Sequence, residues 1–276
     1  MTEFLKPLSE LSYDPHNLKS IVDYAELLLD KSLREVGVQE IPPKHIKKNK
    51  GEFGSYVEQG YFFIKQNNSK EPDFPEVNLE LKTAGILKVT GKEKKQIDIL
   101  KTWKAKEDMS LGSIDFKTIC NEEFETSTFL SKNEHILFVF YEYIKEPHEI
   151  DLRIKIVSTL RFSDLDEREQ ELIKKDWGII NKTIEERGAH NLHQGDTSIL
   201  QAKTSGGVNK NTVENPSSRK HIFTRAFMNI YISDLTPSKN DIKRTRLFTS
   251  ADEVKKMSLQ DKIRENFSPY LDKSDK

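Results

Sequence analysis

The chain of 276 residues contains one cysteine, Cys120, and no apolar run close to the roughly 18 residues that a transmembrane helix requires. One cysteine excludes an intramolecular disulfide framework and any metal site built from several thiolates. The opening residues, MTEFLKPLSEL, lack the charged-then-apolar pattern of a secretory signal. From these absences we expect a soluble protein that works in the cytoplasm.

The sequence also lacks an excess of charge of either sign, because 44 Lys and Arg residues oppose 45 Asp and Glu residues. Bulk charge therefore says nothing in favour of a nucleic-acid partner. Positive charge is nevertheless concentrated locally, in Lys44–Lys50, Lys88–Lys106 and Ala202–Arg225. These segments allow two interpretations: ordinary solvated lysines, or one positive face that binds nucleic acid.

Apolar side chains are present in periodic patterns. Helical spacing predicts helices over residues 17–36, 53–65 and 165–187. Alternating or continuous apolar runs predict strands over 76–83, 136–143, 152–160, 197–203 and 224–232. Because no regular βαβ period appears, we expect a mixed α/β (α+β) class with a central mixed β-sheet flanked by helices.

Residues from 233 onward turn polar, with one weak amphipathic pattern near 251–267. We therefore expect one domain over 1–232, followed by a tail at 233–276 that is helical or connects to a further domain or partner.

The chemistry-bearing segment is Asp73 to Thr83, in which Asp73, Glu80 and Lys82 follow a D-x₆-E-x-K spacing. Strand geometry places Glu80 and Lys82 on the same face, with Asp73 delivered from the preceding turn. Two carboxylates can hold a hard cation such as Mg²⁺, and a lysine can orient a water or stabilise charge on a phosphoryl group. By itself the spacing is weak evidence, because acidic residues and lysines are frequent in this chain and a solvated strand face would show the same pattern.

Further segments, in the same order, resemble the MutH-type endonucleases of the PD-(D/E)xK superfamily, which include a mismatch-repair nickase and type II restriction enzymes that cut at GATC. The resemblance covers roughly residues 18–232 and is greater to the restriction branch. The segments are Lys50–Glu58 (KGEFGSYVE), Asp73–Thr83 (DFPEVNLELKT), Ser131–Val139 (SKNEHILFV), Lys175–Trp177 (KDW), and Gly195–Thr204 with Arg225–Phe227.

The resemblance implies a restriction-endonuclease-like fold and a Mg²⁺ cofactor. It assigns catalysis to Asp73, Glu80, Lys82 and Lys132, and metal binding to Glu58 together with Asp73 and Glu80. Without the resemblance, Glu58 would be interpreted as a solvent-facing helix glutamate, and Lys132 as an ordinary lysine beside a strand. Asn78 departs from the pattern, because a glycine is usual at that position.

The candidates for DNA binding are Lys203, Ser218, Arg219, Lys220 and Arg225. Hydroxyl and basic groups are the side chains that contact phosphate backbones. The alternative for the segment 217–221 is a surface loop without that role.

The expected function is a Mg²⁺-dependent, sequence-specific endonuclease acting on double-stranded DNA, of the type II restriction class and active at GATC-like sites. Two alternatives remain: a strand-nicking mismatch-repair endonuclease, and a DNA-binding or allosteric module without catalysis. One catalytic set cuts one strand, so a double-strand break calls either for two sequential nicks or for a second set, from a second MutH-like domain, a partner subunit or a homodimer.

Overall fold

The computed structural model describes residues 2–40, 51–65, 70–91, 102–145, 148–206, 211–213 and 215–235. It divides into two compact units, each built from two chain segments: Met1–Lys88 with Ser131–Arg161, and Val89–Leu130 with Phe162–Lys276. The lysines of 44–50, most of those in 88–106, and the helix expected near 251–267 lie outside the described residues. Within the described residues, no helix combines the length and the apolar character needed to cross a bilayer.

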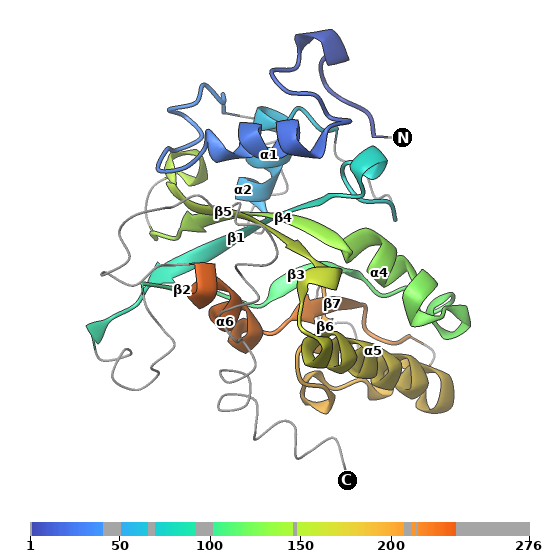
Figure 1. Ribbon diagram of the computed structural model, residues 1–276. Coiled ribbons are helices and arrows are strands. Elements are labelled where there is room, and N and C mark those ends of the chain that lie inside the picture. Colours follow the sequence, from blue (N-terminus) through green and yellow to red (C-terminus); the bar gives the residue numbers. More distant parts are fainter. Residues whose placement is uncertain are drawn as a thin grey trace. The chain divides into compact units, whose positions relative to one another are not determined.

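The sheet of the first unit is mixed, as predicted. β4 (His135–Glu142) lies between β1 (Glu80–Lys88) and β5 (Ile154–Arg161) (Figure 1). β1 and β4 run parallel, with Glu80 opposite Ile136, whereas β4 and β5 are antiparallel. Parallel neighbours need a long crossover connection. Here that connection includes Val89–Leu130, the first segment of the second unit.

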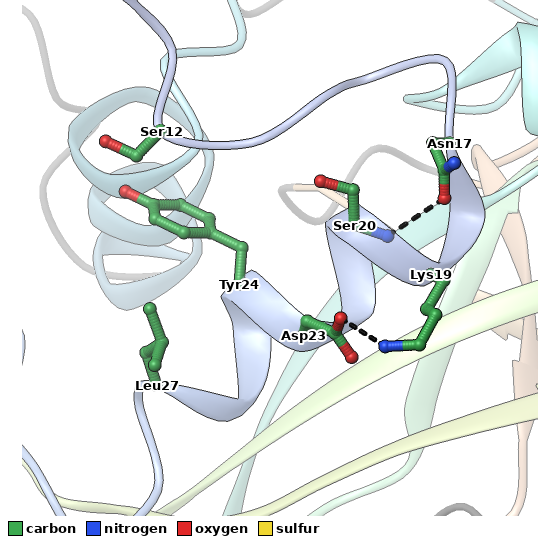
Figure 2. Close-up of a pocket in the computed structure, with 7 residues that line it drawn as sticks. All are labelled: Ser12, Asn17, Lys19, Ser20, Asp23, Tyr24 and Leu27. Carbon is green, nitrogen blue, oxygen red and sulfur yellow. Dashed lines mark hydrogen bonds and ion pairs between the residues drawn. The ribbon is translucent and has the colours of Figure 1, made fainter.

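Helix α1 (Leu18–Glu26) begins where Asn17 caps it, because the Asn17 side chain accepts the Ser20 N–H at 3.1 Å (Figure 2). It ends ten residues before the predicted boundary at 36. Asp30 adopts φ 58°, and its N–H donates to the carbonyl of Ile154 at 2.9 Å. The chain therefore leaves the helix to pair with the start of β5, which helical spacing alone could not indicate.

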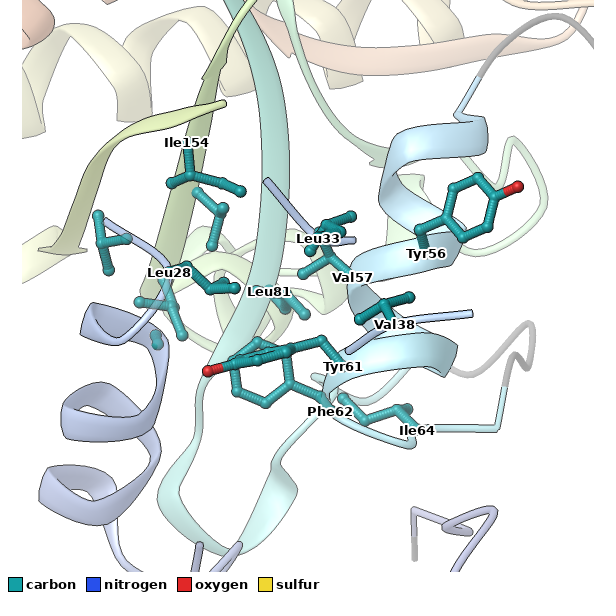
Figure 3. Close-up of a cluster of buried hydrophobic side chains, with 14 of the residues drawn as sticks. Leu28, Leu33, Val38, Tyr56, Val57, Tyr61, Phe62, Ile64, Leu81 and Ile154 are labelled. Atoms are coloured by element: carbon teal, nitrogen blue, oxygen red, sulfur yellow. The ribbon is translucent and has the colours of Figure 1, made fainter. Parts of the chain in front are cut away.

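The core of the first unit forms between its helices and one face of its sheet. Helix α2 (Glu52–Ser55) continues directly into a π-helix, Tyr56–Tyr61, in the region predicted as helix 53–65. Val57 and Leu81 are buried in the same cluster. Figure 3 shows side chains of that cluster around β1, from Leu28 to Phe62. Burial of this apolar surface fixes the π-helix and β1, the two elements that carry Glu58, Glu80 and Lys82.

The second unit contains an antiparallel sheet in the order β3 (Met109–Ser113), β7 (Arg219–Phe223), β6 (Leu200–Thr204). Helix α5 (Glu167–Arg187) matches the predicted helix over 165–187 within two residues. The predicted strand over 224–232 is wrong, because this segment forms helix α6 (Arg225–Leu235). Short apolar runs fit either a strand or a buried helix, and Phe227, Met228 and Ile230 are buried as helix residues.

Two shorter elements bear on the site and on the second unit: α4 (Thr128–Asn133), which directly precedes β4, and β2 (Trp103–Ala105). The backbone N–H of Ala105 donates to the side chain of Asn229 at 2.7 Å, so β2 is bound to α6 within the second unit.

A buried carboxylate joins α5 to the start of β6. Asp176 is 3% exposed, and its oxygens accept the backbone N–H groups of Ser198, Ile199 and Leu200 at 2.7–3.1 Å, together with the Ser198 hydroxyl. Burial raises the pKa of Asp176, and these hydrogen bonds act against that rise. The acidic residue of the Lys175–Trp177 segment therefore orders the strand that carries Lys203.

A second buried acid provides a test of the fold through pH. Glu169 is 1% exposed in the first turn of α5, where it forms a capping box with Asp166. Burial, reinforced by the negative charges of Asp166 and Asp234, raises the pKa of Glu169 to about 8. A folded-state pKa above the unfolded value means that stability from this group is present below about pH 4.5 and is lost as the pH rises to about 8.

The variant Glu169→Gln should therefore be more stable than the wild type at pH 8.5, by at least about 1 kcal/mol, and the gain should shrink toward pH 5. Gln can still accept the Asp166 N–H, so the helix cap is kept. Urea unfolding at the two pH values measures the difference. An equal effect of the substitution at both pH values would contradict a raised pKa of Glu169 in the folded state.

Candidate active site

The predicted catalytic residues meet around one buried carboxylate. The Glu80 side chain, at the start of β1, is 3% exposed, and its Oε1 pairs with the ammonium of Lys82 and lies 3.7 Å from Nζ of Lys132. Its Oε2 accepts the backbone N–H of Asp73 at 3.2 Å. Burial raises the pKa of Glu80, and the two ammonium groups act against that rise. Two cations and one N–H donor therefore offset the cost of burying this charge.

Lys82 is surrounded by carboxylates. Burial disfavours its ammonium, but Glu80 and Asp73, with a smaller contribution from Glu58, outweigh burial and raise the pKa of Lys82. The structure thus brings Glu58, Asp73, Glu80, Lys82 and Lys132 into one cluster within the first unit.

Asp73 is held by the turn that precedes β1. Its Oδ2 accepts the backbone N–H of Leu81 at 3.0 Å, while Phe74 and Leu79 form a β-bridge across the turn. The turn closes at Asn78, which adopts the left-handed conformation with φ 49° and ψ 49°. Glycine adopts this conformation without strain and asparagine tolerates it, which accounts for Asn78 in place of the usual glycine.

Lys132 reaches the cluster because β1 and β4 are parallel. It lies in the last turn of α4, just before β4, and the register sets Glu80 opposite Ile136. The amide of Asn78 donates to the carboxylate of Glu134 at 2.6 Å, so the turn that carries Asp73 is tied to the turn that follows Lys132.

Glu58 belongs to the π-helix, whose extra residue per turn is a feature frequent at functional sites. The helical segment approaches β1 closely at Gly54, where an added Cβ would lie 3.1 Å from the Thr83 hydroxyl. At its start, the backbone N–H of Phe53 donates to the carboxylate of Glu149. The glycine and the capping glutamate together bring Glu58 toward the carboxylates of β1.

The structure corrects the predicted strand in two ways. The strand starts at Glu80 instead of 76, because Pro75–Val77 form a 3₁₀ turn. Alternation predicted a solvated or cleft-lining face for Glu80, yet Glu80 is as buried as its apolar neighbour Leu81. The charged face is enclosed because the cluster itself supplies the partners of the carboxylate.

The carboxylates of the cluster do not make a complete binding site for a divalent cation by themselves. Within the described residues, no group of three or more His, Cys, Asp or Glu side chains is close enough to hold a metal ion. Mg²⁺, however, is usually bound by one or two carboxylates, with water and phosphate oxygens completing the shell. Asp73 and Glu80 provide that oxygen pair, and positive groups already gather around Glu80. The donor set therefore fits a hard cation bound jointly with a phosphate.

The candidate DNA-binding residues occupy the second unit and do not share one face. Lys203 of β6 and Lys220 of β7 are cross-strand partners, so their side chains lie on the same side of the sheet. Ser205 N–H donates to the Ser218 carbonyl at 2.9 Å, which extends the ladder and places Ser218 on that side as well. Arg225 is exposed at the start of α6.

Arg219 points the other way. It is 8% exposed, its Nη1 donates to the Thr204 hydroxyl at 2.5 Å, and burial lowers its pKa. The Nε of Arg219 is buried without a hydrogen-bond partner within the described part of the chain. On the same face His221 packs against Phe129, and burial lowers the pKa of His221 to about 3, so this imidazole is neutral.

Sequence reasoning missed the acidic residues that organise these groups. Glu149 and Asp108 carry no motif of their own, and Glu134 lies inside the segment Ser131–Val139 but the resemblance assigns it no role there. Only their tertiary contacts reveal them. A shallow pocket of about 420 Å³ on α1 is separate from the carboxylate cluster, and Ser12, Lys19, Asp23 and Tyr24 are among its lining residues (Figure 2).

Two comparisons place the chain among known proteins. The family described as "DNA mismatch repair enzyme MutH" matches residues 62–176, which include Asp73, Glu80, Lys82 and Lys132. The type II restriction enzyme Sau3AI of Staphylococcus aureus is 32% identical over 232 residues. That match covers 82% of this chain and 45% of the relative, so the chain spans about half the length of the curated relative it matches.

The left-handed turn at Asn78 predicts a contrast between two substitutions. Asn78→Ala should destabilise the first unit by about 1–2 kcal/mol, because alanine is strained at φ 49°. Asn78→Gly keeps the conformation and should lose well under half as much, although both variants lose the bond to Glu134. Urea unfolding at neutral pH compares them, and equal losses would show that the bond to Glu134 matters more than the backbone conformation.

Proposed function

The chain belongs to the MutH-type endonuclease family, and from this premise we propose that it hydrolyses phosphodiester bonds in double-stranded DNA as a Mg²⁺-dependent, type II restriction-like endonuclease. The observation that carries the proposal is the cluster of Asp73, Lys82 and Lys132 around the buried carboxylate of Glu80.

Each group has a distinct part in the proposed reaction. Asp73 and Glu80 would bind the divalent cation together with the scissile phosphate, and Glu58 would supply a further carboxylate at the edge of that site. The cation, when bound, offsets phosphate charge and lowers the pKa of a coordinated water. Lys82, fixed by its ion pair with Glu80, would orient the attacking water or stabilise charge on the phosphoryl oxygens, and Lys132 would add a second positive charge.

The restriction role is favoured over mismatch repair by the extent of the two matches. The relative named as a restriction enzyme matches over 232 residues, whereas the repair family matches residues 62–176 only. The resemblance to GATC-cutting enzymes makes GATC the first site to test. The repair-type nickase remains the alternative, with cleavage that depends on repair partners.

One carboxylate cluster cuts one strand, so a double-strand break requires either two sequential nicks or a second cluster. A second copy of the chain, a partner subunit or a further MutH-like domain would supply that second cluster. Supercoiled plasmid with and without GATC sites, incubated with Mg²⁺ or with a chelator, tests the proposal. Metal-dependent cutting at GATC supports it, and sequencing of the ends identifies the site. Open circles mark nicking and linear plasmid marks paired cuts. Absence of metal-dependent cleavage across divalent cations would favour a non-catalytic DNA-binding module.

Asp73→Asn should slow single-turnover cleavage by at least about a thousandfold, because a neutral amide is a poor ligand for a hard cation. The amide oxygen can still accept the Leu81 N–H, so the turn is preserved, and DNA affinity should stay within about threefold. Lys82→Ala should cost about a hundredfold to a thousandfold in rate. Glu76→Gln, an exposed charge change in the same turn, is the matched control. Cleavage by Asp73→Asn within tenfold of wild type would refute the assignment.

Lys220 and Arg219 lie on opposite faces of the β3–β7–β6 sheet, so we expect different effects from neutralising each of them. Lys220→Gln should weaken DNA binding for all sequences and reduce the slope of log affinity against log salt by about 1. Arg219→Gln should instead lower the melting temperature and leave the salt slope unchanged, because Arg219 is buried against Thr204. A slope change in Arg219→Gln equal to that of Lys220→Gln would assign Arg219 to phosphate contact, as its sequence context predicts.

A further inference from the structure

Asp108 receives hydrogen bonds from three separate segments of the second unit. The residue immediately precedes β3, and its Oδ2 accepts from Nζ of Lys203 at 2.5 Å and from the side chain of Gln194 at 3.3 Å. Its Oδ1 accepts the backbone N–H of Arg225, the first residue of α6, at 2.9 Å. One carboxylate therefore connects two of the candidate DNA-binding residues.

The connection is partly sheltered from solvent. The Asp108 side chain is 17% exposed and that of Lys203 is 38% exposed. Burial disfavours the charged form of Asp108, but the hydrogen bonds from Lys203 and Arg225 outweigh burial and hold its pKa below the usual range. Asp108 is thus an anion at neutral pH, and its pair with Lys203 is less screened than a surface ion pair.

Lys203 belongs to a row of polar side chains that crosses the sheet. It pairs across the ladder with Lys220, and Lys220 pairs in turn with Ser113 of β3, so the three side chains lie on one face. An ammonium has three N–H donors, and Asp108 needs one of them. Holding the long lysine side chain in place beforehand reduces the entropy that is lost when a phosphate binds.

The first turn of α6 gains from the same carboxylate. N-terminal N–H groups of a helix lack intrahelical partners, and a negative side chain there stabilises the helix start. Because the Arg225 N–H is bonded to Asp108, the exposed Arg225 side chain leaves the backbone at a fixed position relative to Lys203.

We propose that Asp108 is a positioning residue for DNA binding, which fixes Lys203 and the start of α6 in the arrangement that receives the phosphate backbone. This inference rests on the proposed function and adds to it a residue whose own negative charge would repel the phosphates of DNA.

Because Asp108 is negatively charged, a simple charge effect and a positioning role predict opposite changes in DNA affinity when Asp108 is neutralised. A carboxylate on a DNA-binding face repels phosphates, so charge alone predicts that neutralising Asp108 tightens DNA binding. Positioning predicts the opposite, because the loss of the ion pair releases Lys203.

The experiment measures DNA affinity and its salt dependence for the full chain and for Asp108→Asn. Asparagine can still accept the Arg225 N–H but cannot form the ion pair with Lys203. We expect affinity to fall about tenfold and the salt slope to fall by about 1, as in Lys203→Gln. The double variant, which combines Asp108→Asn with Lys203→Gln, should bind DNA no more weakly than Lys203→Gln alone, because Asp108 acts through Lys203. In cleavage assays KM should rise while kcat at saturating DNA is retained.

Glu107→Gln is the matched control, because Glu107 is an exposed neighbour with the same charge change whose ion pair is with Lys106. It should bind DNA as tightly as wild type or slightly more tightly. Binding by Asp108→Asn that equals or exceeds that of Glu107→Gln would overturn the inference.

The variant Asp108→Glu provides a second test, which does not depend on whether Asp108→Asn folds. It keeps the charge but moves the carboxylate by one methylene, so positioning predicts weaker binding and a pure charge effect predicts wild-type binding. Wild-type affinity in Asp108→Glu would overturn the inference even if Asp108→Asn failed to fold. Absence of DNA binding by the wild-type chain would refute the proposed function itself, which separates the two failures.

Discussion

The buried carboxylate of Glu80 is the constraint around which the first unit is organised. A carboxylate that is 3% exposed is tolerated only when cations and N–H donors surround it. Lys82 comes from the same strand, Lys132 from the turn before β4, and the Asp73 N–H from the turn before β1. The contacts that make this burial tolerable are therefore the contacts that gather the proposed catalytic groups, so stability and chemistry depend on the same geometry.

Tight backbone turns bring these groups together. Asn78 takes a left-handed conformation that lets the chain reverse between Asp73 and Glu80, and its side chain reaches the turn beyond Lys132. Gly54 permits the helical segment of Glu58 to approach β1, where any side chain would press on Thr83. The parallel register of β1 and β4 then sets the distance between Glu80 and Lys132. Gly54 and the strand register act through the backbone, whereas Asn78 acts through both its backbone conformation and its side chain.

In the second unit, acidic residues order the basic ones. Asp176 binds the first N–H groups of β6, and Asp108 binds Lys203 and the first N–H of α6. Both carboxylates accept hydrogen bonds from backbone N–H groups at or just before the start of an element, and a hydrogen bond to a charged group contributes more than a screened surface ion pair. The face that we propose binds phosphate thus depends on acidic residues that hold its basic ones in place, and the overall charge balance of the chain gives no hint of this.

The sequence by itself indicated the mixed sheet, the long helix α5 and the proximity of Asp73, Glu80 and Lys82, because periodicity and motif spacing are local properties of the chain. Lys132 entered only through the family resemblance. The sequence misassigned 224–232 as a strand, because a short apolar run fits a helix or a strand equally well until its neighbours are known. It also extended α1 to residue 36, because helical spacing could not show that the chain turns at Asp30 to pair with the start of β5. Only the tertiary structure decided that Glu80 is buried, that Lys220 and Arg219 face opposite ways, and that Asp108 holds Lys203. These facts depend on strand register and on contacts between residues far apart in sequence, which no local pattern encodes.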